Sequence, residues 1–447
     1  MRAKLVIAIA AAAVLVVACT SGGSGAPTTQ ASVSIDTTPV TLSFWSDFSP
    51  GGDTEAQLQH VFDTFHAQYP WITVKPVGNK DDQAIVAAIN GGVPPDVALS
   101  FSPDHIGKFC SSGAFNDLQP YIDASNVDMT QFPPSTQTYT QFDGIQCSLP
   151  MLADAYGLYY NTDLFAAAGI SEPPATITQL TADTKALTEF NPDGSIKRAG
   201  YIPWNGFYGE WGMAALAQSF GCPWFNEDGT SAVNSDCWQQ AFAWQKEMVD
   251  FYGGPDNIVN FLSGLGDEWS PDNGFHTGQV AMMYDGEWRV DSIGDQAPKL
   301  SFATAPFPVA DANSDQYGSG VIGGNLLGIP KGAAHPDDSW LLIHYLATDT
   351  PTLVYLVNNF KNLPTTNASL ESPKLDLPDQ FTPFFAIFAD PNSSFPPITG
   401  SGNLYSDLTG TWNAKWQAGK VAAGDIGAAL DELAQQIDEQ SQLDTGP

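Results

Sequence analysis

The strongest constraint on the fold is the alternation of strands and helices near the start of the chain. Over residues 39–100, short segments with the period of a β-strand alternate with apolar residues spaced as on one face of a helix. The expected strands are residues 39–45, 71–74 and 96–100. One expected helix begins at Asp53, and a second runs over residues 81–90. Strand–helix–strand–helix–strand within about 60 residues is typical of a parallel α/β sheet.

The ends of the expected strands carry candidate ligand-binding residues. In open α/β sheets, ligands bind beyond the carboxyl ends of the strands. Trp45 and Asp47 follow the first expected strand, and Ser102 and Asp104 follow the third. The two aspartates fit a role as helix caps or solvated charges equally well, so both interpretations stay open.

The N-terminus has the pattern of a lipoprotein export signal. Arg2 and Lys4 precede an apolar run over residues 5–17, and Cys19 stands where such signals are cut. We expect a signal peptide over residues 1–19, a lipid on Cys19 and a flexible tether over residues 20–38. An uncleaved anchor helix is the alternative, but the run is shorter than the about 20 apolar residues that span a membrane. The body of the protein is therefore expected on the outer face of a cell membrane, in a Gram-positive organism.

The composition describes a large, acidic, globular protein. The chain has 16 Lys and Arg against 49 Asp and Glu, a formal net charge of −33. This charge excludes binding to nucleic acid, which depends on clustered basic residues. Hydrophobic residues make up 43% of the chain and aromatic residues 12%, which separates it from disordered acidic chains. Its roughly 410 residues after the tether are too many for one core, so we expect two domains.

Once Cys19 is assigned to lipid, an even number of cysteines remains. Cys110, Cys147, Cys222 and Cys237 allow three disulfide pairings in an oxidising compartment. The nearest-neighbour pairings, Cys110–Cys147 and Cys222–Cys237, are favoured because each stays within one stretch of chain. No Cys-x-x-Cys motif occurs and the six histidines are scattered, so neither a metal site nor any cofactor is expected.

Four segments resemble the sugar-binding proteins of ABC importers, of the maltose-binding-protein type. One contains a Phe-x-x-Gly-x-x-Ala-Met-x-x-x-Gly-x-Trp element, and another precedes a helix whose Thr176 cap has Gln179 three residues later. Ile177 departs from the family, which usually has a core Trp there, and this puts no functional residue in doubt. The segments occur in the family's order at residues 147–165, 169–176, 275–288 and 323–333, the last followed by an apolar helix over 339–346.

The resemblance implies a two-lobed periplasmic-binding-protein-like α/β fold of type II, with the ligand in a cleft between the lobes. Lobe 1 would comprise residues 39–150 and 305–370, and lobe 2 residues 151–304 and 371–447. The chain would cross between the lobes near residues 149–151, near 304–306 and within 364–383.

The same resemblance names the principal ligand contacts. Trp288 stands where the family has a Trp that stacks on sugar, and Asp154 matches the family's cleft carboxylate. A sugar offers flat CH faces and a rim of hydroxyl groups, so aromatic rings and carboxylates suit it. Trp204 and Trp211 are as well explained as core residues. The further candidates are Tyr156, Trp204, Tyr208, Trp211, Asp285, Gly323, Gly324 and Asn325, the glycines because their backbone allows close approach.

The function that the resemblance implies is capture of a carbohydrate for an ABC importer. The protein would be a monomeric, lipid-anchored substrate-binding protein that delivers an oligosaccharide to membrane permease subunits. A glycerophosphodiester is the alternative ligand, although anion sites usually recruit cations, which are few here. A glycosidase with Asp285 and Glu287 as its carboxyl pair, and a surface lipoprotein that only contacts other cells or proteins, are the remaining alternatives.

Overall fold

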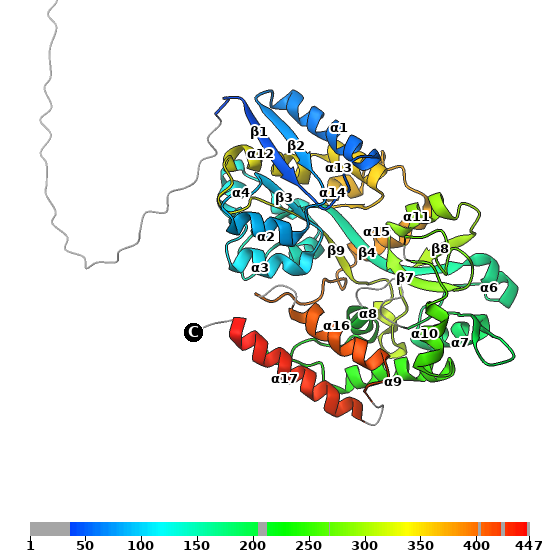
Figure 1. Ribbon diagram of the computed structural model, residues 1–447. Coiled ribbons are helices and arrows are strands. Elements are labelled where there is room, and N and C mark those ends of the chain that lie inside the picture. Colours follow the sequence, from blue (N-terminus) through cyan, green and yellow to red (C-terminus); the bar gives the residue numbers. More distant parts are fainter. Residues whose placement is uncertain (1–35, 204–211, 268, 401–403, 422–424, 445–447) are drawn as a thin grey trace, which may run out of the picture.

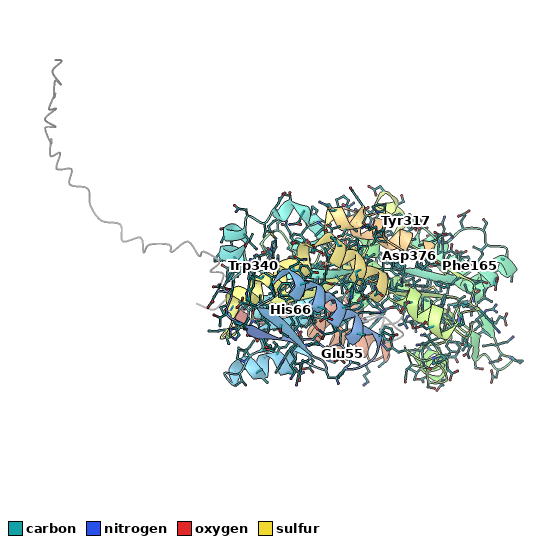
Figure 2. All side chains as sticks on the ribbon, turned by 90° about the horizontal axis from the view of Figure 1, so that it is seen from above. Glu55, His66, Phe165, Tyr317, Trp340 and Asp376 are labelled. Carbon is teal, nitrogen blue, oxygen red and sulfur yellow. A yellow bond between two sulfur atoms is a disulfide. The ribbon has the colours of Figure 1, made fainter. Side chains whose placement is uncertain are left out.

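The computed structural model describes residues 36–203, 212–267, 269–400, 404–421 and 425–444. Figure 1 shows two groups of helices and strands, with strands β4 and β9 running between them. We call the group around strands β1 to β3 the first lobe and the group around helices α6 to α10 the second lobe. Figure 2, seen from above, places Trp340 and His66 in the first lobe and Phe165 at the far end of the second.

The first lobe is built on a mixed sheet with the strand order β10-β4-β9-β3-β1-β2. Strand β1 is parallel to β2 and β3, as the sequence pattern predicts, whereas β9 is antiparallel to β3 and β4. The strands are β1 (Val40–Trp45), β2 (Ile72–Val77), β3 (Val97–Ser100), β4 (Leu149–Asn161), β9 (Ile322–Gly328) and β10 (Leu363–Pro364).

Helices cover both faces of this sheet. Leu42, Phe44 and Leu99 point from the strands into a buried cluster with α1, α12 and α13, while Ala98 faces a second cluster with α2 and α3. The two predicted helices are confirmed as α1 (Asp53–Gln68) and α2 (Asp82–Asn90), the latter capped by Asp81, which accepts from the Ala84 N–H. The other helices here are α3 (Ile106–Ser111), α4 (Gln119–Ser125), α5 (Gln137–Thr140), α12 (Pro336–Thr348), α13 (Thr350–Phe360) and α14 (Asn367–Leu370).

Strand β4 belongs to both lobes. Its first part, Leu149–Ala155, pairs with β9, and its second part pairs with β7 (Met282–Gly286) and β8 (Phe302–Ala305). The partners change at Ala155 and Tyr156, a few residues after the segment 149–151 where we expect the first crossing. One uninterrupted strand of 13 residues therefore forms the passage between the two sheets.

The second lobe consists of helices packed on β4, β7 and β8. The expected cap of α7 is confirmed: Thr176 accepts from the Gln179 N–H, and the Gln179 side chain reaches back to the Thr176 N–H. Helix α16 packs against α8, and α17 packs against α9. The helices are α6 (Thr162–Ala168), α7 (Ile177–Leu187), α8 (Gly212–Phe220), α9 (Asp236–Phe251), α10 (Pro255–Leu262), α11 (Arg289–Gln296), α15 (Thr382–Ala389), α16 (Leu404–Gln417) and α17 (Ile426–Asp444).

Short elements complete the described chain. A small hairpin is formed by β5 (Glu189–Phe190) and β6 (Ile196–Arg198). The 3₁₀ helices are Pro103–His105, Met129–Gln131, Pro134–Thr136, Asp311–Gln316 and Asp379–Phe381. No helix within the described ranges is both long and apolar enough to cross a membrane.

The two favoured disulfide pairings are confirmed. Cys110 of α3 is bonded to Cys147, just before β4, and Cys222 after α8 is bonded to Cys237 of α9. Each disulfide therefore ties together neighbouring elements of one lobe. Cys19 lies outside the described residues.

Candidate functional site

One face of the sheet collects several of the predicted ligand contacts. Asp154 and Tyr156 alternate along β4 and therefore point to the same face. In the antiparallel register Asp154 lies opposite Gly323 of β9, and Tyr156 lies opposite Gly286 of β7, so these residues share that face. The face spans the point where β4 passes from one lobe to the other.

Trp288 forms an aromatic wall at the end of this face. Its ring folds back over the backbone of Gly286, where an added Cβ would lie 2.2 Å from ring carbons, so only glycine fits there. The ring meets Tyr156 edge-on with centroids 5.3 Å apart, and Tyr156 stacks on Tyr284 at 5.6 Å. Trp288 is half-buried, and its indole N–H has no hydrogen-bond partner within the described part of the chain.

Asp154 belongs to a pair of carboxyl groups. The Asn362 side-chain amide donates to Asp154 Oδ1 at 2.9 Å and to Glu287 Oε1 at 3.0 Å, and the two carboxyl groups hydrogen-bond to each other. Glu287 is fully buried, and its Oε2 accepts the Ala155 N–H at 2.9 Å. Burial raises the pKa of Asp154 to about 6. Burial, and then the neighbouring charge of Asp154, raise the pKa of Glu287 well above its ordinary value.

The first-lobe candidates gather at one edge of the sheet. Trp45 and Asp47 lie at the end of β1, and Ser102 and Asp104 flank Pro103, which begins the 3₁₀ helix after β3. Pro103 lies against Gly323, 3.5 Å from where a Cβ would stand, so this edge adjoins the face of Asp154.

The electrostatics of this edge are dominated by carboxylates. Asp47 is exposed, and partial burial followed by the charges of Asp81 and Asp82 raises its pKa. Lys80 places its ammonium group 4.8 Å from the centroid of the Trp45 ring. Asp82 in turn binds His105, and this hydrogen bond raises the pKa of His105. The edge is therefore acidic, and its Trp45 ring is already covered by a cation.

The two glycines of β9 have different roles. At Gly324, φ is +153° and an added Cβ would lie 2.5 Å from the Leu152 carbonyl and 2.8 Å from the Tyr139 hydroxyl. Gly324 therefore allows β4 and β9 to approach closely where their register shifts, and it faces away from Asp154. Gly323 has ordinary space around it and faces the side of Asp154. Gly323 is itself buried, with Pro103 and Phe395 packed beside it.

The structure does not bring Asp285 to the proposed ligand face. Asp285 lies opposite Gly157 in the register, on the other face of the sheet from Tyr156. It is buried and binds Arg289 Nε at 2.7 Å, and the Arg289 guanidinium stacks on Trp269 at 4.5 Å. In this structure Asp285 is therefore the buried partner of Arg289, and a ligand contact through Asp285 stays an untested prediction.

The remaining predicted ligand contacts are Asn325 and three aromatic residues before α8. Asn325 follows Gly323 by two residues on β9 and is nearly buried. Trp204, Tyr208 and Trp211 lie outside the described residues, although the segment that contains them precedes α8.

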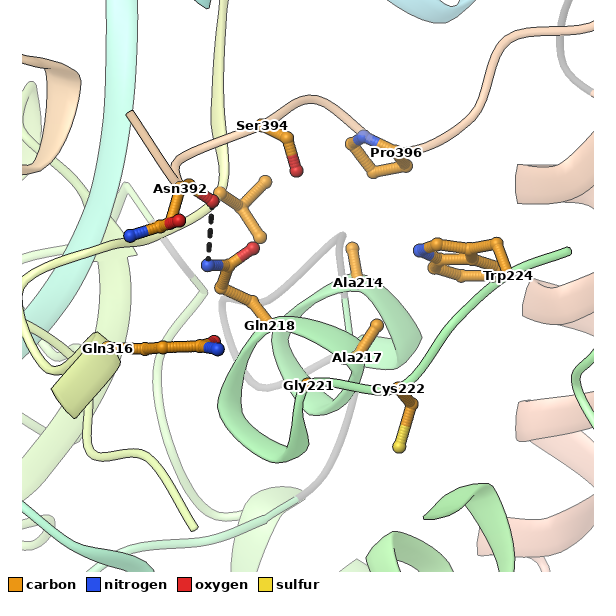
Figure 3. Close-up of a pocket in the computed structure, with 11 residues that line it drawn as sticks. Ala214, Ala217, Gln218, Gly221, Cys222, Trp224, Gln316, Asn392, Ser394 and Pro396 are labelled. Atoms are coloured by element: carbon orange, nitrogen blue, oxygen red, sulfur yellow. Dashed lines mark hydrogen bonds between the residues drawn. The ribbon is translucent and has the colours of Figure 1, made fainter. Parts of the chain in front are cut away.

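A polar pocket lies beside the shared face, between α8 and residues 392–396 (Figure 3). Its volume is about 230 Å³, and Val321, two residues before Gly323 on β9, forms part of its wall. The Gln218 amide donates to the Ser319 hydroxyl at 2.8 Å and to the Asn392 carbonyl at 3.2 Å. Figure 3 shows the ring of Trp224 at one end of the pocket and Gln316 and Asn392 at the other.

Sequence reasoning missed Asn362 and the pairing of Glu287 with Asp154. Glu287 is visible in the sequence as an acidic residue between Gly286 and Trp288, at the end of an apolar strand. Asn362 gives no such signal, because it lies 208 residues from Asp154 and 75 from Glu287.

The fold is that of two-lobed binding proteins. Over 89% of this chain and all of the other, the structure superposes on that of CpMnBP1 with mannotriose bound (TM-score 0.75, 23% identity). The sugar-binding protein MalE from Xanthomonas citri is similar over 90% of this chain and 97% of its own, with a TM-score of 0.73 and 21% identity.

Sequence comparison supplies the family. A model of the bacterial extracellular solute-binding proteins matches residues 51–352. The chain belongs to this family. A maltotriose-binding protein of Pyrococcus abyssi is 24% identical over 336 residues, which are 74% of this chain and 68% of that protein.

Proposed function

We propose that this protein captures an oligosaccharide outside the cell and delivers it to the permease of an ABC importer. The observation that carries the proposal is the arrangement of Trp288, Tyr156 and Asp154 on one face at the crossing between the lobes. The names of similar proteins support the substrate class, since one is a maltotriose-binding protein and another was solved with mannotriose bound.

The proposed contacts match the chemistry of a neutral sugar. The indole of Trp288 offers an apolar platform for the CH face of a pyranose ring, and Asp154 offers an acceptor for its hydroxyl groups. Ser102, Asp104 and Asn325 would add contacts from the first lobe. The polar pocket next to Val321 would give room for part of a second ring.

The alternative ligand, a glycerophosphodiester, has less support. A phosphate needs an available cation or an exposed helix N-terminus. Arg289, the arginine nearest the site, is fully buried and already paired with Asp285.

A glycosidase also has less support from the geometry. Catalytic carboxyl groups stand about 5 Å or more apart on either side of the bond that they cleave. Asp285 and Glu287, the carboxyl pair that the sequence offers for such an enzyme, are both buried, and Asp285 is already paired with Arg289. We therefore propose that the protein binds its sugar without turnover.

The proposed mechanism is closure of two lobes on the ligand. The division into residues 39–150 with 305–370 and 151–304 with 371–447 places Asp154 at the boundary between the two lobes. We further propose that Cys19 carries a lipid that holds the protein on the outer face of the cell membrane. The two lobes, attached to the membrane through the tether over residues 20–38, would then reach the permease as a monomer.

A thermal-shift screen tests the proposal. The panel contains maltose, maltotriose, mannotriose, glucose and glycerophosphocholine. A bound ligand at 100 times its dissociation constant adds about 2.7 kcal/mol of apparent stability, which raises the melting temperature. We expect stabilisation by an oligosaccharide. Stabilisation by glycerophosphocholine alone would overturn the proposed substrate class, and release of monosaccharide on incubation would overturn the binding-only role.

A further inference from the structure

Glu287 is a buried acid for which the proposed function has no direct use. It is fully buried, so it cannot touch a ligand in this state. Its side chain lies beside the part of β4 where that strand changes partners. Ala153 of β4 pairs with β10, and Tyr156 pairs with β7. There the carboxylate of Glu287 accepts the N–H of Ala155. Glu287 therefore stabilises the backbone of β4 at the crossing.

The second feature is the bridge made by Asn362. Its amide has two N–H groups, and it donates one to Asp154 and the other to Glu287. Asn362 comes between α13 and β10 of the first lobe, whereas Glu287 follows β7 of the second lobe. Asp154 is thus held from both lobes at once, by Asn362 of the first lobe and Glu287 of the second.

A hydrogen bond between Asp154 and Glu287 requires that one of the two acids carries a proton. Two ionised carboxylates are acceptors only, so they cannot bind each other. The N–H groups of Asn362 and Ala155 already donate to carboxyl oxygens of Asp154 and Glu287, so they do not supply the proton between the two acids. One proton on the pair converts the repulsion into a hydrogen bond and leaves one negative charge.

We propose that Glu287 and Asn362 are positioning residues that hold Asp154, through a proton shared by the two acids, in the orientation in which it accepts a sugar hydroxyl. This inference rests on the proposed function. Loss of the shared proton places two negative charges side by side and releases Asp154. Sugar affinity should then fall as the pH rises, since only the fraction that retains the proton is competent to bind.

Burial supports the existence of this proton near neutral pH, because it raises the pKa of both acids. The other charged or titratable groups near the pair do not supply the same pH dependence. The hydroxyls of Tyr139 and Tyr159 have pKa values well above the ordinary value, so both stay neutral. Asp285 is held in its ion pair with Arg289.

An independent source of pH dependence is Asp291 of α11. Burial raises the pKa of Asp291, the charge of Asp295 raises it further, and the charge of Lys361 opposes both effects. Lys361 adjoins Asn362, so a titration of Asp291 could reach the same region of the site. Asp291→Asn therefore serves as a variant that removes this contribution and leaves the carboxyl pair intact.

The experiment is calorimetric titration of maltotriose, with mannotriose as a second probe, at pH values from 5.5 to 8.5. We expect the wild type and Asp291→Asn to lose affinity with rising pH, by at most about tenfold per pH unit. Glu287→Gln should bind with little pH dependence, because its amide donates to Asp154 without a titratable proton. Its carbonyl still accepts from Ala155, but its amide nitrogen cannot accept from Asn362, so its affinity should stay below that of the wild type at low pH. Glu287→Ala should bind more weakly than Glu287→Gln at every pH. Glu247→Gln, an exposed acid on α9, is the matched control and should keep the wild-type profile.

The outcomes separate this inference from the proposed function. Sugar binding with the same pH profile in the wild type and in Glu287→Gln overturns the inference alone. Absence of binding to every sugar of the panel at every pH overturns the proposed function and the inference with it. If Glu287→Gln fails to fold, carboxyl ¹³C NMR of the wild type decides, because one group of the pair should stay protonated above pH 7. Titration of both groups below pH 5 would overturn the shared proton.

Discussion

The position of the Trp288 ring depends on the residue beneath it. Gly286 has no side chain, so the indole can lie across the backbone and still touch Tyr156. The ring is half-buried and its other neighbours leave the N–H unpaired among the described residues. A side chain in this state can contribute to binding without being essential to the core.

Trp288→Ala should weaken sugar binding by about 2 kcal/mol or more, the usual cost of truncating an aromatic anchor. Folding should be retained, because the ring packs at the edge of a buried cluster and is not one of its buried members. Calorimetry with maltotriose and thermal unfolding measure the two effects. Phe190→Ala removes a 40% exposed aromatic ring from the β5–β6 hairpin and is the control. Equal affinity of Trp288→Ala and the wild type would refute the site.

The carboxyl pair makes stability depend on pH in a definite direction. A folded-state pKa raised above the unfolded value contributes stability that is present at low pH and lost as the pH rises through the folded pKa. The variant Glu287→Gln keeps Asp154, so the comparison reports Glu287, whose unfolded pKa is about 4 and whose folded pKa is held well above that by burial. Relative to Glu287→Gln, the wild type should therefore lose free energy of unfolding from about pH 4 upward, by at most about 1.4 kcal/mol per pH unit. Urea unfolding at several pH values measures this difference, and parallel curves would contradict it.

Sequence reasoning reached the residues that carry local motifs and missed those that depend on distant contacts. Trp288 and Asp154 stand in recognisable segments, and the structure places them with Tyr156 near one another. Asp285 stands in the same motif as Trp288, yet strand alternation turns it to the opposite face. Asn362 could not be predicted, since its role exists only when two segments far apart in the chain meet.

At the scale of elements, the α/β alternation over residues 39–100 is confirmed to within a few residues. The reason is that caps, glycines and apolar spacing are local signals. Strand β4 was not among the predicted strands, because its 13 residues depend on pairing with β9, β7 and β8. The close approach of β9 at Gly324 likewise depends on Leu152 and Tyr139.

The disulfide between α8 and α9 gives a prediction for these elements. Replacing both Cys222 and Cys237 by Ser opens a loop with a sequence separation of 15 residues. In the chain-entropy model this lowers the free energy of unfolding by about 3 kcal/mol. Chemical unfolding of the oxidised wild type and of the double variant measures the loss. Sugar affinity at a temperature where both are folded should be unchanged, and a large loss of affinity would show that this disulfide shapes the site.

At the scale of the whole molecule, closure on the ligand should make the protein more compact. Small-angle scattering with and without saturating maltotriose should show a smaller radius of gyration in the complex. Trp288→Ala at the same concentration should show a smaller change, because fewer molecules are occupied. Identical scattering curves for the free and bound wild type would contradict closure while leaving the binding site itself untouched.

The continuity of β4 links the two lobes in a way that a loop would not. Side chains alternate along the strand, so the orientation of every residue after Ala155 is set by the count of residues before it. Deleting one residue between Asp154 and Leu158 would leave each lobe able to fold in outline, but it would turn Asp154 and the Trp288 wall toward opposite faces. The number of residues in the crossing therefore fixes the relative orientation of Trp288 and Asp154. Substitutions can change the chemistry of the crossing, but a change in its length separates these two side chains.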